Sequence, residues 1–265
     1  MIEKILKKIK IATNYKKIEF GLIIGSGLSD LVPQKKILSI PYNEIPNFPK
    51  TKISSHSGTL DIVVISGKNV AVLNGRCHFY ENGDSSLMYN PINILKRMGI
   101  KKMIITNSAG SLKKKMFPGS IMIIKDHINL TGQNPLIGFG NDEVFVDMVN
   151  AYDKKLIKSF IKTAKKENIK VHSGVYTWFS GPSFETPAEI NLLKKVGSNA
   201  VGMSTVPEVI ICRYLKIRVL GISVITNFAA GLSKKEISHE QTKLIAPKGG
   251  NKIKKVLNSF LRENQ

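Results

Sequence analysis

Apolar residues recur along the chain in short runs that alternate with stretches of helical periodicity. Isoleucine and leucine repeat at helical spacing over residues 2–12, and a second helix is expected over about residues 152–166. Eight runs have the length and composition of buried strands: 20–24, 60–66, 70–73, 102–107, 120–125, 171–179, 199–203 and 217–226. Strands that alternate with helices in this way predict an α/β protein.

Residues 179–231 contain two sequence signals for the start of a helix. Residues 186–189 (TPAE) combine a hydroxyl N-cap, a proline at the first helical position and a glutamate three residues after the cap, and residues 205–208 (TVPE) repeat this pattern. Each signal follows an apolar run, which is the order expected in a parallel sheet. Ligands of such sheets bind beyond the carboxyl ends of the strands. The polar residues at those ends predict a small-molecule pocket: Ser180, Glu185, Ser204 and Asn227.

Length and composition favour one soluble domain over residues 1–265. No linker and no internal repeat interrupts the 265 residues. The two cysteines, Cys77 and Cys212, have no CxxC spacing, which suits a reducing cytoplasm and argues against a structural zinc site. No run approaches the roughly 18 apolar residues of a membrane span, and the N-terminus does not have the pattern of a signal peptide. We therefore expect a cytoplasmic protein without a membrane partner.

The formal charge of +21 raises the question of nucleic-acid binding. Five of the 40 basic residues are arginines, which leaves 35 lysines, and these are scattered over the whole chain without interleaved aromatic residues. Proteins that read bases rely on the bidentate fork of arginine. The charge therefore predicts a solvated surface with no specific nucleic-acid partner, although such a field attracts phosphate-bearing substrates.

A glycine-rich turn, Gly25-Ser26-Gly27, follows the first predicted strand. Such a turn presents backbone N–H groups to an anion, and Ser26 adds a hydroxyl. The dinucleotide-binding fingerprint would need a third glycine at position 30, where this chain has Asp30. The loop therefore fits phosphate or another oxyanion better than a dinucleotide. A tight turn without a ligand remains the alternative.

Arg76 and His78 follow another predicted strand and are two residues apart, so in an extended chain they point to the same side. A guanidinium beside an imidazole suits a phosphate dianion. The alternative is an ordinary surface arginine next to a half-buried histidine.

Two further segments carry small or polar residues. Residues 106–111 (TNSAGS) end a predicted strand with small side chains that let backbone amides approach a ligand. Residues 126–136 (DHINLTGQNPL) have no metal-ligand spacing and are expected to form a structural or subunit-contact loop.

Seven motifs stand in the order found in one enzyme family: GSGLSDL, GRCHFYENG, TNSAGSL, DHINLTGQNPLIG, SGPSFETPAE, GMSTVPEVI and SVITN. Over about residues 20–260 the chain resembles the trimeric, low-molecular-mass purine nucleoside phosphorylases. The resemblance implies a single α/β domain whose central mixed, partly barrel-like sheet is flanked by helices. It also implies a purine-salvage enzyme that reversibly converts 6-oxopurine (deoxy)ribonucleosides, such as inosine and guanosine, and phosphate to free base and (deoxy)ribose 1-phosphate. Phosphate is then a co-substrate, and neither a metal nor another cofactor is required.

The resemblance also implies roles for individual residues. Phosphate would be bound by Ser26, His56, Arg76, His78, the amide of Ser108, and Ser204. The nucleoside would contact Tyr80, Phe184, Met203 and His239, and the purine would be recognised by Glu185 and Asn227, which with His78 are the catalytic candidates. Phe145 would reach the ribose pocket of the neighbouring subunit in a homotrimer. The chain departs from the family pattern at Asn82, Asp84, Ser108 (for alanine) and Ser111 (for glycine).

The expected chemistry agrees with these roles. Cleavage of the glycosidic bond leaves positive charge on the ribosyl group and negative charge on the purine, so the site needs an anion under the sugar and donors at the base. Asn227 would donate to N7 and interact with the 6-oxygen, and Glu185 would accept from N1–H. Two alternatives stay open: a methylthioadenosine phosphorylase, in which aspartate replaces the base-binding asparagine, and a non-catalytic nucleoside- or RNA-binding protein.

Overall fold

The structure is a computed structural model that describes residues 2–49, 58–233 and 236–264. Within these ranges, the strands are β1 (Ile18–Ile23), β2 (Lys36–Pro41), β3 (Thr59–Ile65), β4 (Lys68–Asn74), β5 (Lys102–Ser111), β6 (Ile121–Asn129), β7 (Val171–Trp178), β8 (Ala200–Gly202) and β9 (Arg218–Phe228). The α-helices are α1 (Ile2–Ala12), α2 (Tyr89–Arg97), α3 (Lys154–Lys166), α4 (Pro187–Lys195), α5 (Val206–Tyr214) and α6 (His239–Glu263). Short 3₁₀ helices are η1 (Ser29–Leu31), η2 (Tyr42–Glu44), η3 (Phe79–Glu81) and η4 (Asp142–Val144).

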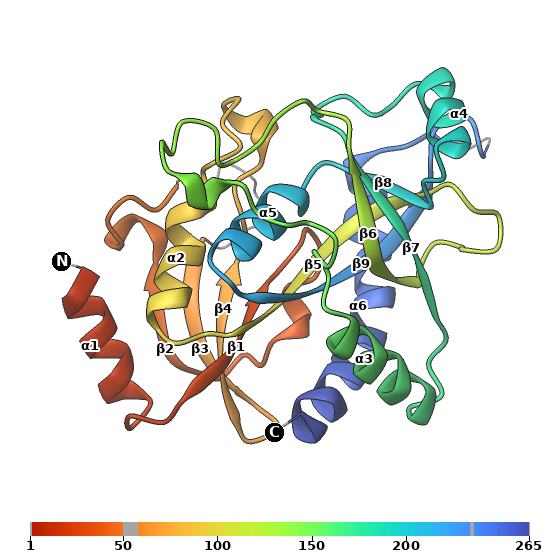
Figure 1. Cartoon of the computed structure of the whole chain (residues 1–265). Helices are drawn as coiled ribbons and strands as arrows, with labels where there is room; N and C mark the ends of the chain where they lie inside the picture. Colours follow the sequence, from red (N-terminus) through yellow and green to blue (C-terminus); the bar gives the residue numbers. More distant parts are fainter. Residues whose placement is uncertain (1, 50–57, 234–235, 265) are drawn as a thin grey trace.

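The described strands form one nine-stranded sheet that partly closes on itself. Its order is β2-β3-β4-β1-β5-β8-β7-β6-β9, and β9 pairs in addition with β5. This second pairing closes β5, β8, β7, β6 and β9 into a barrel, from which β1, β4, β3 and β2 continue outward (Figure 1). The predicted mixed, partly barrel-like sheet flanked by helices is confirmed.

Strand directions bring four carboxyl ends to one edge. The pairs β1–β4, β1–β5 and β5–β9 are all parallel. The parallel sheet predicted for residues 179–231 is correct for β7 and β8, which pair in parallel. It is wrong for β9, which runs antiparallel to β6, the parallel neighbour of β7, and has its parallel partner in β5 instead. The long β9 is apolar along almost its whole length because it is buried between β5 and β6 in the barrel.

Among the described residues, two large apolar clusters fill the space between the sheet and the helices, and a third, smaller one packs α4 against the sheet. One large cluster gathers buried residues of α1, α2 and α5, and the other large cluster gathers buried residues of α3 and α6 (Figure 1). Helix α6, which the sequence analysis did not predict, packs directly on β9. A Cβ at Gly249 would come within 2.4 Å of Val224, so a glycine is needed where α6 crosses this strand.

Of the two predicted capping boxes, one forms. The Thr186 hydroxyl accepts from the backbone N–H of Glu189 at 3.2 Å, and the Glu189 carboxylate accepts from the backbone N–H of Thr186 at 2.7 Å. Helix α5 begins at Val206 with Thr205 at its N-cap position, as predicted, but no capping box forms there, because the Thr205 side chain makes no cap hydrogen bond. The Thr205 hydroxyl and the Glu208 carboxylate instead bind groups in the interior.

Two predicted strand ends were too early. Residues 106–111 lie within β5, because Gly110 and Ser111 pair with both β8 and β9. The start of the predicted loop 126–136 belongs to β6, which pairs with β7 as far as Asn129. None of the helices in the described ranges has the length and apolar character of a membrane span.

Asp153 links α3 to β9. Its carboxylate caps the helix by accepting from the backbone N–H of Leu156 at 2.8 Å, and it pairs with both Nε (2.6 Å) and Nη2 (3.0 Å) of Arg218. Burial acts to raise the pKa of Asp153, but the hydrogen bonds from Arg218 and Leu156 outweigh this effect, so the pKa lies below its usual value.

We predict that Asp153→Asn will lower the free energy of unfolding by up to about 1 kcal/mol at pH 7. Asparagine caps helices as well as aspartate does, so the loss reports the ion pair. Because the folded-state pKa is depressed, this stabilisation is present above the unfolded pKa of about 3.9 and is lost as the pH falls through the folded value. Urea unfolding at pH 7 and pH 3 measures the difference between the two proteins. A difference that does not shrink in acid would contradict the assignment.

Candidate active site

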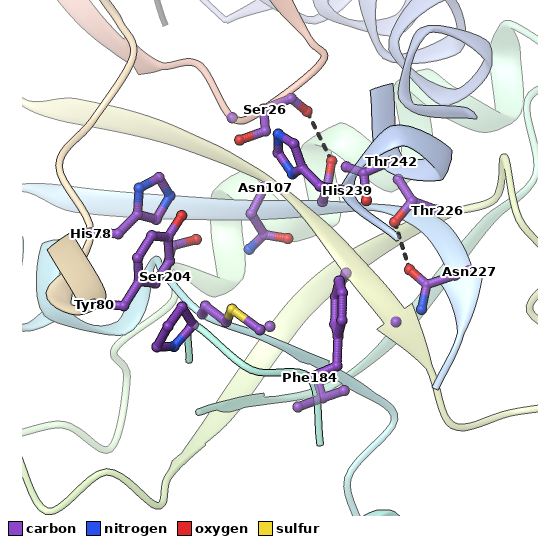
Figure 2. A pocket seen from close by; sticks show the side chains of 18 of the residues that line it. Ser26, His78, Tyr80, Asn107, Phe184, Ser204, Thr226, Asn227, His239 and Thr242 are labelled. Carbon is purple, nitrogen blue, oxygen red and sulfur yellow. Dashed lines mark hydrogen bonds between the residues drawn. The ribbon is translucent and has the colours of Figure 1, made fainter. Parts of the chain in front are cut away.

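A cavity of about 270 Å³ opens at the carboxyl ends of β1, β4, β5 and β9. Figure 2 shows His78, Tyr80 and Ser204 on one side of it and Phe184, Thr226 and Asn227 on the other. The cavity brings together eleven of the predicted site residues: Ser26, Arg76, His78, Tyr80, Ser108, Phe184, Glu185, Met203, Ser204, Asn227 and His239.

Three predicted site residues are not in this set. Ser180, which follows β7, does not line the cavity. His56 lies outside the described residues. Phe145 is 86% exposed, directly after η4, and does not line the cavity of its own chain. A contribution of Phe145 to a neighbouring subunit stays a prediction.

The loop after β1 lies directly against β5. The backbone N–H of Gly25 donates to the Thr106 hydroxyl at 3.0 Å, and the Ser108 hydroxyl donates to the carbonyl of Ser26 at 2.9 Å. A Cβ at Gly25 would come within 2.8 Å of the Cα of Asn107, so only glycine permits this approach. The two hydroxyls of β5 therefore fix the loop that presents Ser26 to the cavity.

Arg76 enters the cavity wall from the buried side. Its guanidinium pairs with the Glu208 carboxylate of α5 at 2.9 Å and also donates to the carbonyl of Thr106 in β5. Both charged side chains are nearly inaccessible, at 1% and 2% exposure. The arginine that was predicted to meet phosphate thus already shares its charge with a carboxylate.

His78 is held by the short helix that follows it. Glu81 accepts from the backbone N–H of His78 at 2.7 Å and lies 3.2 Å from its ring Nδ1. The His78 ring stacks on the Tyr80 ring, with centroids 4.8 Å apart and planes at 12°. Burial raises the pKa of Tyr80 to about 12, so its hydroxyl is protonated at neutral pH and can donate a hydrogen bond. Both rings are therefore fixed before a ligand binds.

A cluster of three side chains lies behind Ser204. The amide of Asn107 donates to the Thr205 hydroxyl at 2.8 Å, the Arg76 guanidinium approaches that hydroxyl at 3.3 Å, and the Ser204 hydroxyl lies 3.2 Å from it. Ser204 lines the cavity, whereas Thr205 is completely buried. The polar wall of the cavity is thus continuous with a hydrogen-bonded network in the interior.

The opposite end of the cavity has amide and carboxyl groups suited to a heterocycle. Asn227 accepts from the Thr226 hydroxyl at 2.9 Å through Oδ1 and donates to the carbonyl of Phe228 at 2.9 Å through Nδ2, which fixes the plane of its amide. Glu185 is 8% exposed, and burial, aided by the nearby Glu189 carboxylate, raises its pKa. These groups offer a donor and an acceptor to the same cavity, which the exposed Phe184 also lines.

His239 begins α6 at the rim of the cavity. Partial burial and the nearby Lys243 and His78 lower the pKa of its imidazole. The ring is therefore mostly neutral at pH 7 and can exchange a hydrogen bond with a hydroxyl group. Within the described ranges, we find no group of three His, Cys, Asp or Glu side chains that could hold a metal ion.

The sequence analysis missed the residues that hold the predicted ones in place. Glu208 had a usable signal, because a lone carboxylate in the apolar stretch VPEVIIC predicts burial with a cationic partner. Asn107 had a similar signal as an amide at the end of an apolar strand. Glu81 and Thr226 hold residues close to them in sequence, His78 and Asn227, but nothing in the sequence pattern indicated these contacts. Thr205 had no signal because its partners Asn107 and Arg76 lie on segments far apart in sequence.

Comparison with known proteins agrees with this geometry. The sequence model of the phosphorylase superfamily matches residues 19–262. Purine nucleoside phosphorylase 1 of Bacillus subtilis (strain 168) is 42% identical over 234 residues, which is 87% of this chain and 86% of that protein. The structure of Schistosoma mansoni purine nucleoside phosphorylase in complex with adenosine matches with a TM-score of 0.89 and 34% identity, covering 100% of this chain and 97% of the other. The same enzyme in complex with inosine gives 0.88 and 35%, covering 100% and 96%. The chain therefore belongs to the phosphorylase superfamily and, within it, to the purine nucleoside phosphorylases.

Proposed function

We propose that this enzyme cleaves 6-oxopurine nucleosides, including inosine, guanosine and their deoxy forms, with inorganic phosphate as the nucleophile. One observation carries the proposal: a single cavity is lined by hydroxyl, imidazole and guanidinium groups and also by a carboxylate and an amide. Phosphate and purine would then lie on either side of the ribose. The products are the free base and (deoxy)ribose 1-phosphate.

The hydroxyl, imidazole and guanidinium groups suit a phosphate dianion. Ser26, His78 and Ser204 surround it on three separate segments, and Arg76 lies behind them. Such preorganised donors stabilise an anion without rearranging when charge develops. Phosphate held there would both attack the anomeric carbon and offset the positive charge of the ribosyl group.

The amide and the carboxylate suit the leaving purine. One hydrogen of the Asn227 amide is taken by the Phe228 carbonyl, which leaves the second hydrogen for the purine N7 as negative charge gathers there. Ionised Glu185 would accept from N1–H of a 6-oxopurine. Tyr80, Phe184, Met203 and His239 would contact the base and ribose, and a protonated Tyr80 would donate to a ribose oxygen.

We further propose that residues 1–265 act as one phosphorylase domain in the cytoplasm, without a cofactor and without a specific nucleic-acid partner. Phosphorolysis replaces the bond from the anomeric carbon to the purine with a bond to phosphate. This exchange involves no oxidation or reduction. The lysine-rich composition, with few arginines, supports a solvated surface rather than base recognition.

A homotrimer with shared sites is also proposed. Apolar side chains of the segment between β6 and α3 face solvent, with Phe145 86%, Val149 82% and Ile137 72% exposed. The segment is nevertheless anchored to α5, since Arg213 donates twice to the carbonyl of Asp147, at 2.9 and 3.2 Å. An anchored segment that exposes large apolar side chains is typical of a protein–protein interface, and a closed ring of three subunits would complete three sites.

The first test is the dependence on phosphate. We predict that the purified protein releases hypoxanthine from inosine in the presence of phosphate and that release falls to background without it. A coupled oxidase assay for hypoxanthine, with parallel detection of ribose 1-phosphate, measures both products. Equal release without phosphate would show hydrolysis and contradict the proposal.

Glu185 sets a prediction for pH. Because burial raises its pKa, the ionised acceptor is present above that raised value and is lost as the pH falls through it. We therefore predict that kcat/KM for inosine declines on the acid side at a pH above that of an exposed glutamate, about 4.3. Glu185→Gln should lower kcat/KM for inosine about tenfold at pH 7, because a charge-assisted hydrogen bond is lost, and should remove this acid decline.

The same variant tests base selectivity. The amide of glutamine can donate to N1 of adenosine, so Glu185→Gln should raise the adenosine-to-inosine ratio of kcat/KM. Glu44→Gln, an exposed acid in η2, should keep the wild-type pH profile and ratio. An unchanged profile and ratio in Glu185→Gln would rule out this residue as the N1 acceptor.

The shared site predicts complementation between subunits. Phe145→Ala alone should raise KM for inosine about tenfold or more, because an aromatic contact to the nucleoside is lost. Mixing Phe145→Ala chains with Asn227→Ala chains should restore part of the activity, since some sites combine an intact cavity with an intact Phe145. A matched mixture of Phe145→Ala chains with the double variant Phe145→Ala/Asn227→Ala should show no recovery. Proven subunit exchange without recovery in the first mixture would exclude a shared site.

A further inference from the structure

We propose that Thr205 is a positioning residue that turns the hydroxyl of Ser204 toward the phosphate. The inference rests on the proposed function, in which Ser204 binds the anion. Thr205 is fully buried and cannot touch a ligand, whereas Ser204, its neighbour in sequence, lines the cavity. Any effect of Thr205 on phosphate must therefore pass through another residue.

The backbone of Thr205 has a conformation that threonine rarely adopts. Its φ is +79° and its ψ is −46°, and the backbone N–H of Val206 donates to the carbonyl of Ser204 at 2.9 Å. These values describe a γ-turn with positive φ, the rare and strained form of this turn. This conformation is unfavourable for a β-branched residue. Glycine would adopt this turn without strain. A threonine held here, at the wall of the candidate active site, indicates that its side chain has a role there.

The hydrogen-bond partners of Thr205 fix the direction of its own O–H. A hydroxyl oxygen has two lone pairs and one proton. The two lone pairs face donors, namely Nδ2 of Asn107 at 2.8 Å and Nη1 of Arg76 at 3.3 Å. The proton of Thr205 is therefore directed to the remaining partner, the Ser204 hydroxyl oxygen at 3.2 Å.

Ser204 then accepts from Thr205 and has its own proton to donate. The hydroxyl of Tyr176 lies beside the Ser204 backbone and side chain, and phosphate in the cavity would be a second acceptor. A charged acceptor makes the stronger hydrogen bond, so the proton of Ser204 turns to phosphate when phosphate binds. The chain of donors runs from Arg76 and Asn107 through Thr205 to Ser204 and the anion.

Four variants test this chain of donors: Ser204→Ala, Thr205→Val, Thr205→Ser and the double variant Ser204→Ala/Thr205→Val. Valine keeps the β-branched shape and the backbone strain but lacks the hydroxyl, and serine keeps the hydroxyl. The readouts are KM for phosphate and kcat with saturating inosine, together with the melting temperature of each protein. We expect Ser204→Ala and Thr205→Val each to raise KM for phosphate about tenfold, with KM for inosine unchanged. Thr205→Ser should keep the wild-type KM.

The double variant decides whether Thr205 acts through Ser204. If it does, KM for phosphate in the double variant equals that of Ser204→Ala alone, because coupled residues are not additive. A double variant with the product of the two single effects would overturn the proposal, as would a Thr205→Val protein with wild-type KM. With either of these results, a raised KM for phosphate in Ser204→Ala would still support the assignment of Ser204 to the phosphate site. A wild-type KM in Ser204→Ala would overturn both the phosphate site and the positioning role.

Thr205→Gly keeps the test decisive if the valine variant does not fold. Glycine removes the hydroxyl and relieves the positive φ. We expect a melting temperature at or above that of the wild type together with the same tenfold rise in KM for phosphate. Wild-type phosphate kinetics in a stable Thr205→Gly protein would overturn the proposal.

Discussion

The buried ion pair between Arg76 and Glu208 is the contact on which the rest of the candidate site depends. It joins the segment after β4 to α5, and through the carbonyl of Thr106 it also reaches β5. Removing one partner of a buried pair typically costs about 3–5 kcal/mol, because the other charge is left uncompensated. The three segments that carry His78, Ser108 and Ser204 are therefore held in one arrangement by a charge interaction in the interior rather than by a ligand.

This pairing changes how the site can recognise an anion. An arginine that already faces a carboxylate supplies oriented N–H groups but little net charge. Affinity for phosphate then has to come from several neutral or partly charged donors, each contributing about 0.5–1.5 kcal/mol, and from the positive field of a chain with a formal charge of +21. Such a site would depend on the direction of each donor, which is the property that the proposed role of the buried Thr205 would supply.

The sequence predicted the features that depend on local pattern. Helix α1 was expected from its apolar spacing and α4 from the cap at residues 186–189, because both signals act within a few residues. The candidate site residues were found because each follows a predicted strand. The start of α5 carries the same local signal as α4, yet its threonine and glutamate bind Asn107 and Arg76 instead. Buried donors from distant segments outcompeted the cap. Helix α6 was missed because Pro247, Gly249 and Gly250 oppose a helix locally, and packing on β9 overrides them.

The residues that line the cavity differ in exposure, and this difference bears on the chemistry. Arg76, His78, Glu185 and Asn227 are buried, whereas Phe184 and His239 are exposed. Phosphorolysis requires that water be kept from the anomeric carbon, since water would otherwise compete with phosphate as the nucleophile. In one chain alone Phe184 and His239 face solvent, so a bound nucleoside would need a further cover on this side. An exposed Phe145 on an anchored segment is a physically suitable cover, which gives the proposed trimer a chemical purpose beyond stability.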